Sequence, residues 1–188
     1  MKNYLQSFNI LTEEEIDSFC ELLVPKKIKK GEFFITEGKT CKQIAFIVSG
    51  LFRSFYYSSE EEDVTYCFTF ENSFLAAYSS MITQLPTEEN IQALSDCELL
   101  VISKEKMDQL EKSSTNWLML SKTIAQSEYL KMESRVFMLQ RESAETRYHN
   151  LVENHPKYLN SIPLNYLASY LGITPRHLSR IRKSISSV

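Results

Sequence analysis

The sequence lacks the residue patterns on which most catalytic and cofactor sites are built. Only four of its 188 residues are glycine, and it contains no phosphate-binding glycine loop, no G-x-S-x-G and no H-E-x-x-H motif. Its three histidines are scattered towards the C-terminus and do not cluster with Asp or Glu. We therefore expect no enzyme activity and no bound metal or cofactor.

Cysteine is also scarce, and its four copies stand far apart at Cys20, Cys41, Cys67 and Cys97. No C-x-x-C pair exists, so neither a zinc site nor a disulfide framework is indicated. Long apolar runs are missing as well. None approaches the roughly 20 residues that span a bilayer, and the N-terminus has no signal-peptide core. These absences favour a cytoplasmic protein with reduced thiols and no membrane partner.

Acidic residues are absent from the last part of the chain. The charged residues after position 156 are all basic and give a local charge of +5: Lys157, Arg176, Arg180, Arg182 and Lys183. Because the whole chain carries −3, the other 156 residues carry −8. A basic, acid-free end on an acidic body suits binding to a phosphate backbone, although a merely solvated basic tail has the same composition.

Most of the body shows the pattern of an antiparallel β-structure. Thr12 to Glu15 form a capping box before a short helix that Pro25 ends. Short runs rich in β-branched and aromatic residues then alternate with turn residues, which predicts a sandwich or roll. The expected strands are Lys26–Ile28, Phe33–Thr36, Gln43–Val48, Leu51–Tyr57, Val64–Phe70, Asn90–Leu94 and Glu98–Ile102. The acidic stretch Ser58–Asp63 is the expected tip of a hairpin.

A long helix is predicted next, because neither Gly nor Pro interrupts positions 117–140. One apolar stripe on it comprises Trp117, Leu120 and Ile124. A second stripe has the alternating three- and four-residue spacings of a coiled-coil seam. This seam consists of Leu118, Ala125, Tyr129, Met132, Val136 and Leu139. Two apolar faces imply two partners, the β-domain and a second copy of the chain. The alternative is a single helix buried in a monomeric core.

The last thirty residues predict two short helices joined by a tight turn. Ala168 is small where the helices approach each other, and Gly172 supplies the left-handed backbone that ends the first helix. Thr174 is a good N-cap and Pro175 suits a first helical turn, so a second helix begins here. Such a pair is the helix-turn-helix motif, whose second helix enters the DNA major groove.

The second helix of this pair has an apolar side and a polar side. Leu178 and Ile181 face inward. The expected DNA-binding residues occupy the start and outer face of the helix: Thr174, Arg176, His177, Ser179, Arg180 and Lys183. Arginine pairs bidentately with guanine, and Ser or His reaches base edges or phosphates. An ordinary helical hairpin with a solvated basic face is the alternative.

Nearly the whole chain resembles the family of the cAMP receptor protein and the fumarate–nitrate regulator (the Crp/Fnr family), in its compact Bacteroidetes-like form. The matching segments are KGE at 30–32 with Gly38, IVSGLFR at 47–53, LGITP at 171–175 and LSRIR at 178–182.

The resemblance implies an α+β fold in three parts. These are a cyclic-nucleotide-binding-like antiparallel β-roll with flanking helices at residues 1–112, a dimerisation helix at 113–141 and a helix-turn-helix, winged-helix-like DNA-binding domain at 142–188. Few residues follow the second helix of the pair, so no long C-terminal wing is expected. The implied partners are double-stranded DNA and a second copy of the chain, with RNA polymerase and an unknown small-molecule effector as further candidates.

The chain departs from the family where nucleotide-binding members hold the cyclic phosphate. Their glycine-rich segment ending in Gly-Glu aligns with residues 72–77, and their Arg-Ser pair aligns with Thr87 and Glu88, followed by Glu89. Carboxylates stand where a phosphate needs a cation, so we expect no binding of cAMP or cGMP. Clustered N-terminal cysteines for an iron–sulfur centre are absent too, and no haem ligand is evident. Three apolar residues near this segment suit either a ligand pocket or core packing: Phe74, Tyr78 and Met81.

Two functions remain open. The first is a transcription regulator of the Crp/Fnr type that binds an inverted-repeat operator as a homodimer. The second is a regulatory protein-interaction module with a cyclic-nucleotide-binding-like roll and no sequence-specific DNA binding. The second gives no reason for the capped, acid-free second helix, and a mobility-shift assay with duplex DNA separates the two.

Overall fold

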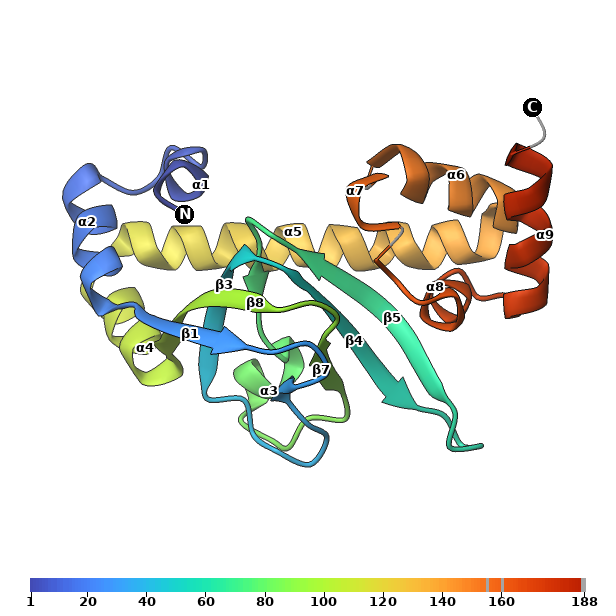
Figure 1. The fold of residues 1–188 in the computed structure, drawn as a ribbon. Coiled ribbons are helices and arrows are strands. Elements are labelled where there is room, and N and C mark those ends of the chain that lie inside the picture. The colour runs from blue at the N-terminus through green and yellow to red at the C-terminus, as the bar shows by residue number, and fades with distance from the viewer. Residues whose placement is uncertain (155, 160, 187–188) are drawn as a thin grey trace.

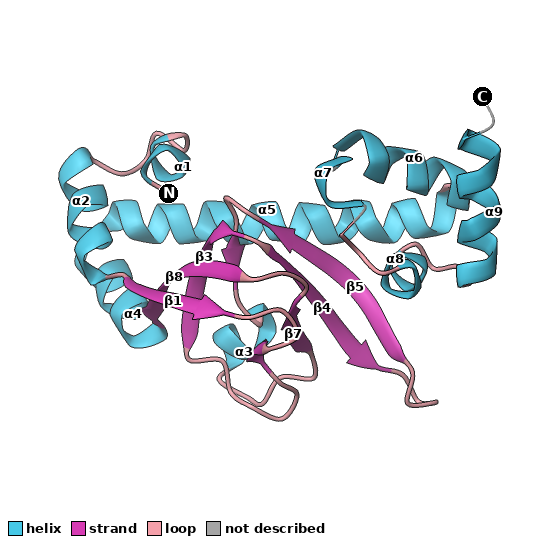
Figure 2. Cartoon of the chain, viewed as in Figure 1, coloured by secondary structure: helices cyan, strands magenta, loops and turns pink. Residues whose placement is uncertain are grey.

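The computed structural model describes residues 1–154, 156–159 and 161–186. It is an α+β structure in which a β-roll lies along a long helix, and a group of short helices gathers at the far end of that helix (Figure 1). Strands are confined to the first part of the chain, and the described residues after Ser103 form only helices and their connections (Figure 2).

Two short helices precede the roll, α1 (Lys2–Gln6) and α2 (Glu13–Leu22). The predicted capping box is confirmed: the Glu15 N–H donates to Thr12 Oγ1 at 3.2 Å, and the Thr12 N–H donates to the Glu15 carboxylate at 2.9 Å. Helix α2 buries Ile16 and Phe19 against the long helix. Helix α1 was not predicted, since five residues are too few for a periodic pattern to stand out.

The roll consists of two four-stranded sheets in which every pairing is antiparallel. The first sheet has the order β1 (Val24–Ile28), β8 (Cys97–Ser103), β3 (Gln43–Ser49), β6 (Phe74–Leu75). The second has the order β2 (Phe33–Ile35), β7 (Asn90–Ala93), β4 (Leu51–Tyr57), β5 (Asp63–Phe70). All seven predicted strands are present, within one or two residues at each end. The two-residue β6 and helix α3 (Tyr78–Thr83) were missed.

The core of the roll lies between its sheets, where Ile47, Phe52, Ile91 and Leu99 are almost fully buried. The acidic hairpin tip joins β4 to β5 as predicted, and the Ser58 N–H donates to the Glu62 carbonyl across it. Asp63 differs from the expectation, because it belongs to β5 and pairs in register with Tyr57.

The long helix α5 (Thr115–Arg141) follows α4 (Lys104–Ser113) and extends about 40 Å at 1.5 Å per residue. Its first stripe packs on the rest of the chain as predicted: Trp117 and Leu120 are buried, and the Trp117 ring lies 4.8 Å from that of Phe19. Within the described ranges, no helix is long and apolar enough to cross a bilayer.

Four helices close the chain: α6 (Ala144–Asn154), α7 (Pro156–Leu159), α8 (Leu164–Tyr170) and α9 (Pro175–Ser186). They share one apolar core, in which Leu167, Ala168, Leu171 and Leu178 are almost inaccessible to solvent. Leu51 and Phe68 of the roll belong to the same cluster. The C-terminal helices are therefore packed on the roll as well as on each other.

Candidate nucleic-acid interface

The turn between α8 and α9 has the geometry that the sequence predicted. Gly172 adopts a left-handed backbone with φ of +66°. Its N–H donates to the Ser169 carbonyl and the Ile173 N–H donates to the Ala168 carbonyl, both at 3.0 Å. These two bonds form a Schellman motif, which satisfies the last carbonyls of a helix and needs a residue without a Cβ penalty at its left-handed position. The chain thus ends α8 sharply and redirects into α9.

Helix α9 begins where Thr174 caps it, because Thr174 Oγ1 accepts the His177 N–H at 3.2 Å. Its inner side holds Leu178, which is fully buried, and Ile181, which is nearly so. With twelve residues, α9 is about 18 Å long. An α-helix with its side chains is about 10–12 Å across, which fits the B-DNA major groove of about 12 Å.

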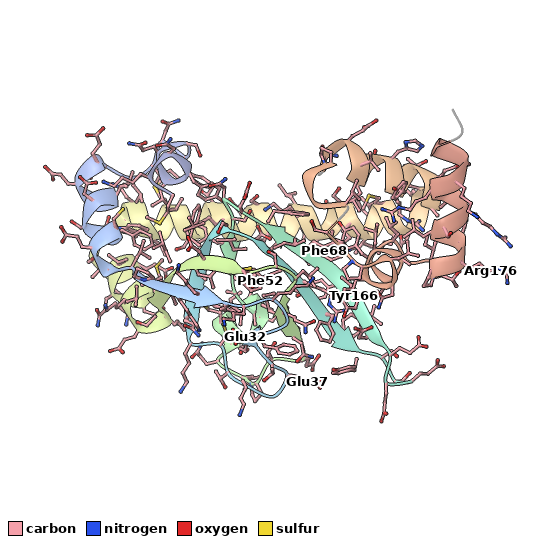
Figure 3. The ribbon with its side chains drawn as sticks, in the orientation of Figure 1. Glu32, Glu37, Phe52, Phe68, Tyr166 and Arg176 are labelled. Atoms are coloured by element: carbon pink, nitrogen blue, oxygen red, sulfur yellow. The ribbon has the colours of Figure 1, made fainter. Side chains whose placement is uncertain are left out.

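The outer face of α9 carries most of the residues predicted to contact DNA. Thr174, Arg176, His177, Arg180 and Lys183 are exposed, and Ser179 is half-buried beside them. Arg176 extends from the outward side of the helix (Figure 3). No Asp or Glu occurs in α9. The structure thus brings the six residues together on one surface of a single helix and its N-cap.

One basic residue of α9 has a different place. Arg182 is turned towards α6, and its Nε donates to the Tyr148 hydroxyl at 3.1 Å. A guanidinium held against the neighbouring helix helps to fix the position of α9 relative to α6. The local charge of the C-terminal segment is therefore divided between an outward face and an internal contact.

The predicted dimer seam lies along the side of α5 that the rest of the chain leaves open. Leu118, Tyr129, Met132, Val136 and Leu139 expose between 38 and 65% of their surface, and Ala125 is half-buried. Three further apolar side chains that the heptad pattern did not include are exposed on the same helix: Met119, Leu130 and Phe137. Exposed apolar strips of this kind are typical of interaction surfaces.

Two arginines that sequence reasoning missed hold the end of α8. Arg135 of α5 donates from Nη2 to the Tyr170 carbonyl at 2.6 Å, and its guanidinium lies 3.9 Å from the centre of the Tyr170 ring. Arg147 of α6 donates from Nε to the Leu171 carbonyl at 3.0 Å and from Nη1 to the Glu142 carbonyl at 2.7 Å. The orientation of α8 is therefore tied to α5 and α6 by charge-assisted bonds.

A third arginine, Arg53 of β4, joins the roll to α8. It is only 2% exposed, donates to the Asp63 carboxylate at 2.7 Å, and its guanidinium lies between the rings of Phe55 and Tyr166, 3.9 and 3.5 Å from their centres. Nearby, the Thr65 N–H of edge strand β5 donates to Ser169 Oγ of α8 at 2.9 Å. Phe68 and Tyr166 mark the two sides of this junction in Figure 3. Helix α8 thus packs directly on the roll.

Of the residues aligned with the family's phosphate site, Thr87 to Glu89 line an open groove of about 400 Å³ at the end of α3. Glu88 and Glu89 line it together with Tyr56 and Tyr66, and none of the described residues that line it is Lys or Arg. Burial raises the pKa of Glu89, although the hydrogen bond from the Tyr66 hydroxyl works against this. The same burial and the nearby Glu89 charge raise the pKa of Tyr66. The groove is acidic, as the sequence suggested.

Phe74, Tyr78 and Met81, for which the sequence left two uses open, line an apolar pocket of about 170 Å³. The pocket lies where β6 and α3 meet α4 and α5, and Trp117 and Ile124 of α5 form part of its wall. All four cysteines are free. Among the described residues, no group of three or more His, Cys, Asp or Glu side chains could hold a metal ion.

Residues 25–114 match the family model of the cyclic nucleotide-binding domain, whereas no curated protein matches the sequence significantly. Solved structures match over most of the chain. FixK2 from Bradyrhizobium japonicum has a TM-score of 0.78 at 14% identity, covering 88% of this chain and 85% of that one. A transcriptional regulator of the Crp/Fnr family from Eubacterium rectale has a TM-score of 0.76 at 17% identity, covering 98% and 88%.

The c-di-GMP responsive global regulator CLP from Xanthomonas campestris has a TM-score of 0.72 at 14% identity, covering 94% of this chain and 92% of that one. Residues 25–114 therefore resemble the cyclic nucleotide-binding domain, and the chain as a whole has the fold of Crp/Fnr regulators. The resemblance noted in the sequence is confirmed at this level.

Proposed function

We propose that the chain is a homodimeric transcription regulator of the Crp/Fnr type that binds an inverted-repeat operator through α9. The observation that carries the proposal is α9 itself. It is an amphipathic helix without acidic residues, capped by Thr174 and held on α8 by Leu178 and Ile181, with its cationic side exposed. In a helix-turn-helix, this is the helix that enters the major groove.

The side chains of α9 divide by chemistry into base and phosphate contacts. Arg176 and Arg180 lie one turn apart on the exposed face and are suited to bidentate pairing with guanine. His177 and Ser179 have shorter side chains for base edges. Lys183 and the Thr174 hydroxyl lie towards the two ends of the helix and are suited to contact phosphates. Such contacts would fix the position of the protein on the duplex but would not distinguish one base sequence from another.

A dimer follows from α5. Its exposed strip, from Leu118 to Leu139, gives a second copy an apolar surface to bury. Two-fold symmetry about this seam would place the two α9 helices about one DNA turn apart, roughly 34 Å, which requires an inverted repeat. In this proposal residues 1–112 form the effector domain, 113–141 the dimerisation helix and 142–188 the DNA-binding domain, with RNA polymerase as a further partner at promoters.

The effector domain in this proposal does not respond to a cyclic nucleotide. A phosphate in the groove at the end of α3 would meet Glu88 and Glu89 instead of a cation. The same charges disfavour c-di-GMP, which the name of CLP mentions. The match to the cyclic nucleotide-binding domain thus describes the fold of this region, whereas nucleotide binding depends on the residues that line the groove.

A mobility-shift assay with operator duplexes selected from a random library tests the proposal. Arg176→Ala with Arg180→Ala should cost about 1–3 kcal/mol for each lost guanine pair and relax specificity at those positions. The matched control removes two exposed charges from the roll, Lys29→Ala with Lys30→Ala. Equal operator binding by the wild type and the α9 variant would refute the DNA-binding role. Failure of the wild type to bind duplex DNA would favour a protein-interaction module.

A further inference from the structure

The apolar pocket beside α5 is lined by residues of seven helices and strands, from α2 to α5. Its lining includes Phe74 of β6, Tyr78 and Met81 of α3, and Trp117 and Ile124 of α5. Its volume is about 170 Å³. An apolar cavity of about 150 Å³ is enough to hold benzene, so this pocket has room for one ring and a short chain.

The charged groups that line the pocket are all acidic. Two carboxylates line it, Glu111 of α4 and Glu128 of α5, and Ser121 donates its hydroxyl to Glu111 at 2.5 Å. Burial raises the pKa of Tyr78, and the charges of Glu128 and Glu111 raise it further. Lys131 pairs with Glu128 at 2.6 Å, but none of the described residues lining the pocket is Lys or Arg.

We propose that this pocket binds a small apolar amine, a ring or short hydrocarbon body with a cationic head, and that this amine is the effector of the regulator. The second part of this inference, the effector role of the amine, rests on the proposed function. The apolar walls select the body, and Glu111 and Glu128 select a positive head through charge-assisted hydrogen bonds. The same two charges repel an anion of the same size.

The position of the pocket connects it with the dimer seam. Five residues of α5 line it: Trp117, Leu120, Ser121, Ile124 and Glu128. The seam residues Leu118, Ala125 and Tyr129 interleave with them on the same turns of the helix. A ligand that prefers one placement of α5 on the roll therefore shifts the population of that placement, by as much as its affinities for the two placements differ.

Trp117 gives a direct readout, because it is the only tryptophan of the chain and lines the pocket. The full chain is titrated at neutral pH with phenethylamine, 2-phenylethanol and 3-phenylpropionate, which share a body and differ in the charge of the head. We expect saturable fluorescence changes with the amine binding about tenfold more tightly than the acid and the alcohol lying between them. Glu111→Gln with Glu128→Gln should make the amine and the alcohol equal.

Two controls accompany the titration. Glu105→Gln with Glu133→Gln removes one carboxylate from each of the same two helices outside the pocket and should leave the preference for the amine intact. Ala76→Leu fills the pocket and should weaken all three probes. The proposal is overturned by an absence of saturable binding of the amine up to about 10 mM, a Kd beyond which little binding energy is left, or by an acid that binds as tightly as the amine.

The regulatory half is tested separately by repeating the operator mobility shift with and without saturating phenethylamine. A changed operator affinity supports an effector role, and an unchanged affinity with proven binding of the amine overturns that role. If the amine binds and no duplex DNA is bound under either condition, the proposed DNA-binding function is wrong but the proposal that the pocket binds an amine is supported. If operator binding is intact and the amine does not bind, the pocket inference alone fails.

Discussion

The contact between Arg53 and Tyr166 gives a sharp test of whether α8 is docked on the roll in solution. The guanidinium lies 3.5 Å from the centre of the Tyr166 ring and is almost fully buried. A cation–π contact is worth about 0.5–1 kcal/mol at an exposed site and about 2 kcal/mol when desolvated. Since Arg53 is desolvated and also stacks on Phe55, we expect a coupling energy of about 1–2 kcal/mol between Arg53 and Tyr166.

The coupling is measured by a double-mutant cycle with Arg53→Met, Tyr166→Leu and the double variant, in urea denaturation at one fixed protein concentration. The cycle is needed because each single change has other costs. Arg53→Met also leaves Asp63 without its partner, though Asp63 is 38% exposed and water can solvate it. Tyr166→Leu keeps an apolar side chain at the junction, so most of its loss is the ring contact. For a chain of this length, 1 kcal/mol corresponds to about 2–4 °C in Tm.

Tyr170 provides the matched control, because it lies on the same helix but stacks on Arg135 instead. A cycle between Arg53 and Tyr170 should give a coupling below about 0.5 kcal/mol, the usual limit of additivity for separate sites. If the Arg53–Tyr166 coupling is as small as this control, the docked arrangement of α8 is not the main state in solution and the reasoning from this junction is wrong.

The remaining predictions concern the seam, the groove and its titration. Met132→Glu with Val136→Glu would bury unpaired charges in the seam and should give monomers with weak operator binding, whereas a wild type that sediments as a monomer at micromolar concentration would contradict the dimer. Calorimetry with cAMP or cGMP should show no binding tighter than millimolar, equivalent to about 4 kcal/mol, and a micromolar Kd would show that residues 72–77 and 87–89 do not replace the phosphate site. Because burial raises the pKa of Glu89 in the folded state, its protonation favours folding, and this contribution is lost as the pH rises through the folded-state pKa. Glu89→Gln should therefore be more stable than the wild type near neutral pH and lose this advantage below the ordinary pKa of glutamate, and a gap that widens on acidification would disprove the assignment.

The parts of the fold that were predictable are those in which local chemistry decides the structure. Seven strands followed from β-branched and aromatic runs, and the turn between α8 and α9 followed from Gly172 and Thr174, whose backbone and capping roles depend only on their neighbours. The elements that were missed, α1, β6 and α3, have five, two and six residues. Segments this short form because packing holds them, and no period identifies them in advance.

The arginines at the junctions could not be predicted, because nothing near them in the sequence marks their partners. Arginine is usually exposed, yet Arg53 is buried against Tyr166, which lies more than a hundred residues later. Leu139 shows the same limitation at the end of the seam. It was placed there by spacing alone, and in the structure its Cδ2 lies 3.4 Å from where a Cβ on Gly172 would stand. Spacing identifies the apolar face of a helix, but tertiary structure decides which neighbour covers each residue.

The three arginine contacts together explain how α9 can keep its outer face open while its orientation stays under the control of the rest of the chain. Arg53 of the roll, Arg135 of α5 and Arg147 of α6 all act on α8 or on the turn that follows it. Helix α9 is in turn fixed to α8 through the Gly172 turn and Leu178. A shift of α5 relative to the roll must therefore strain or break contacts to α8 before it changes α9. Because packed junctions of this kind favour discrete arrangements over gradual bending, we expect the exposed face of α9 to respond to such a shift as a unit.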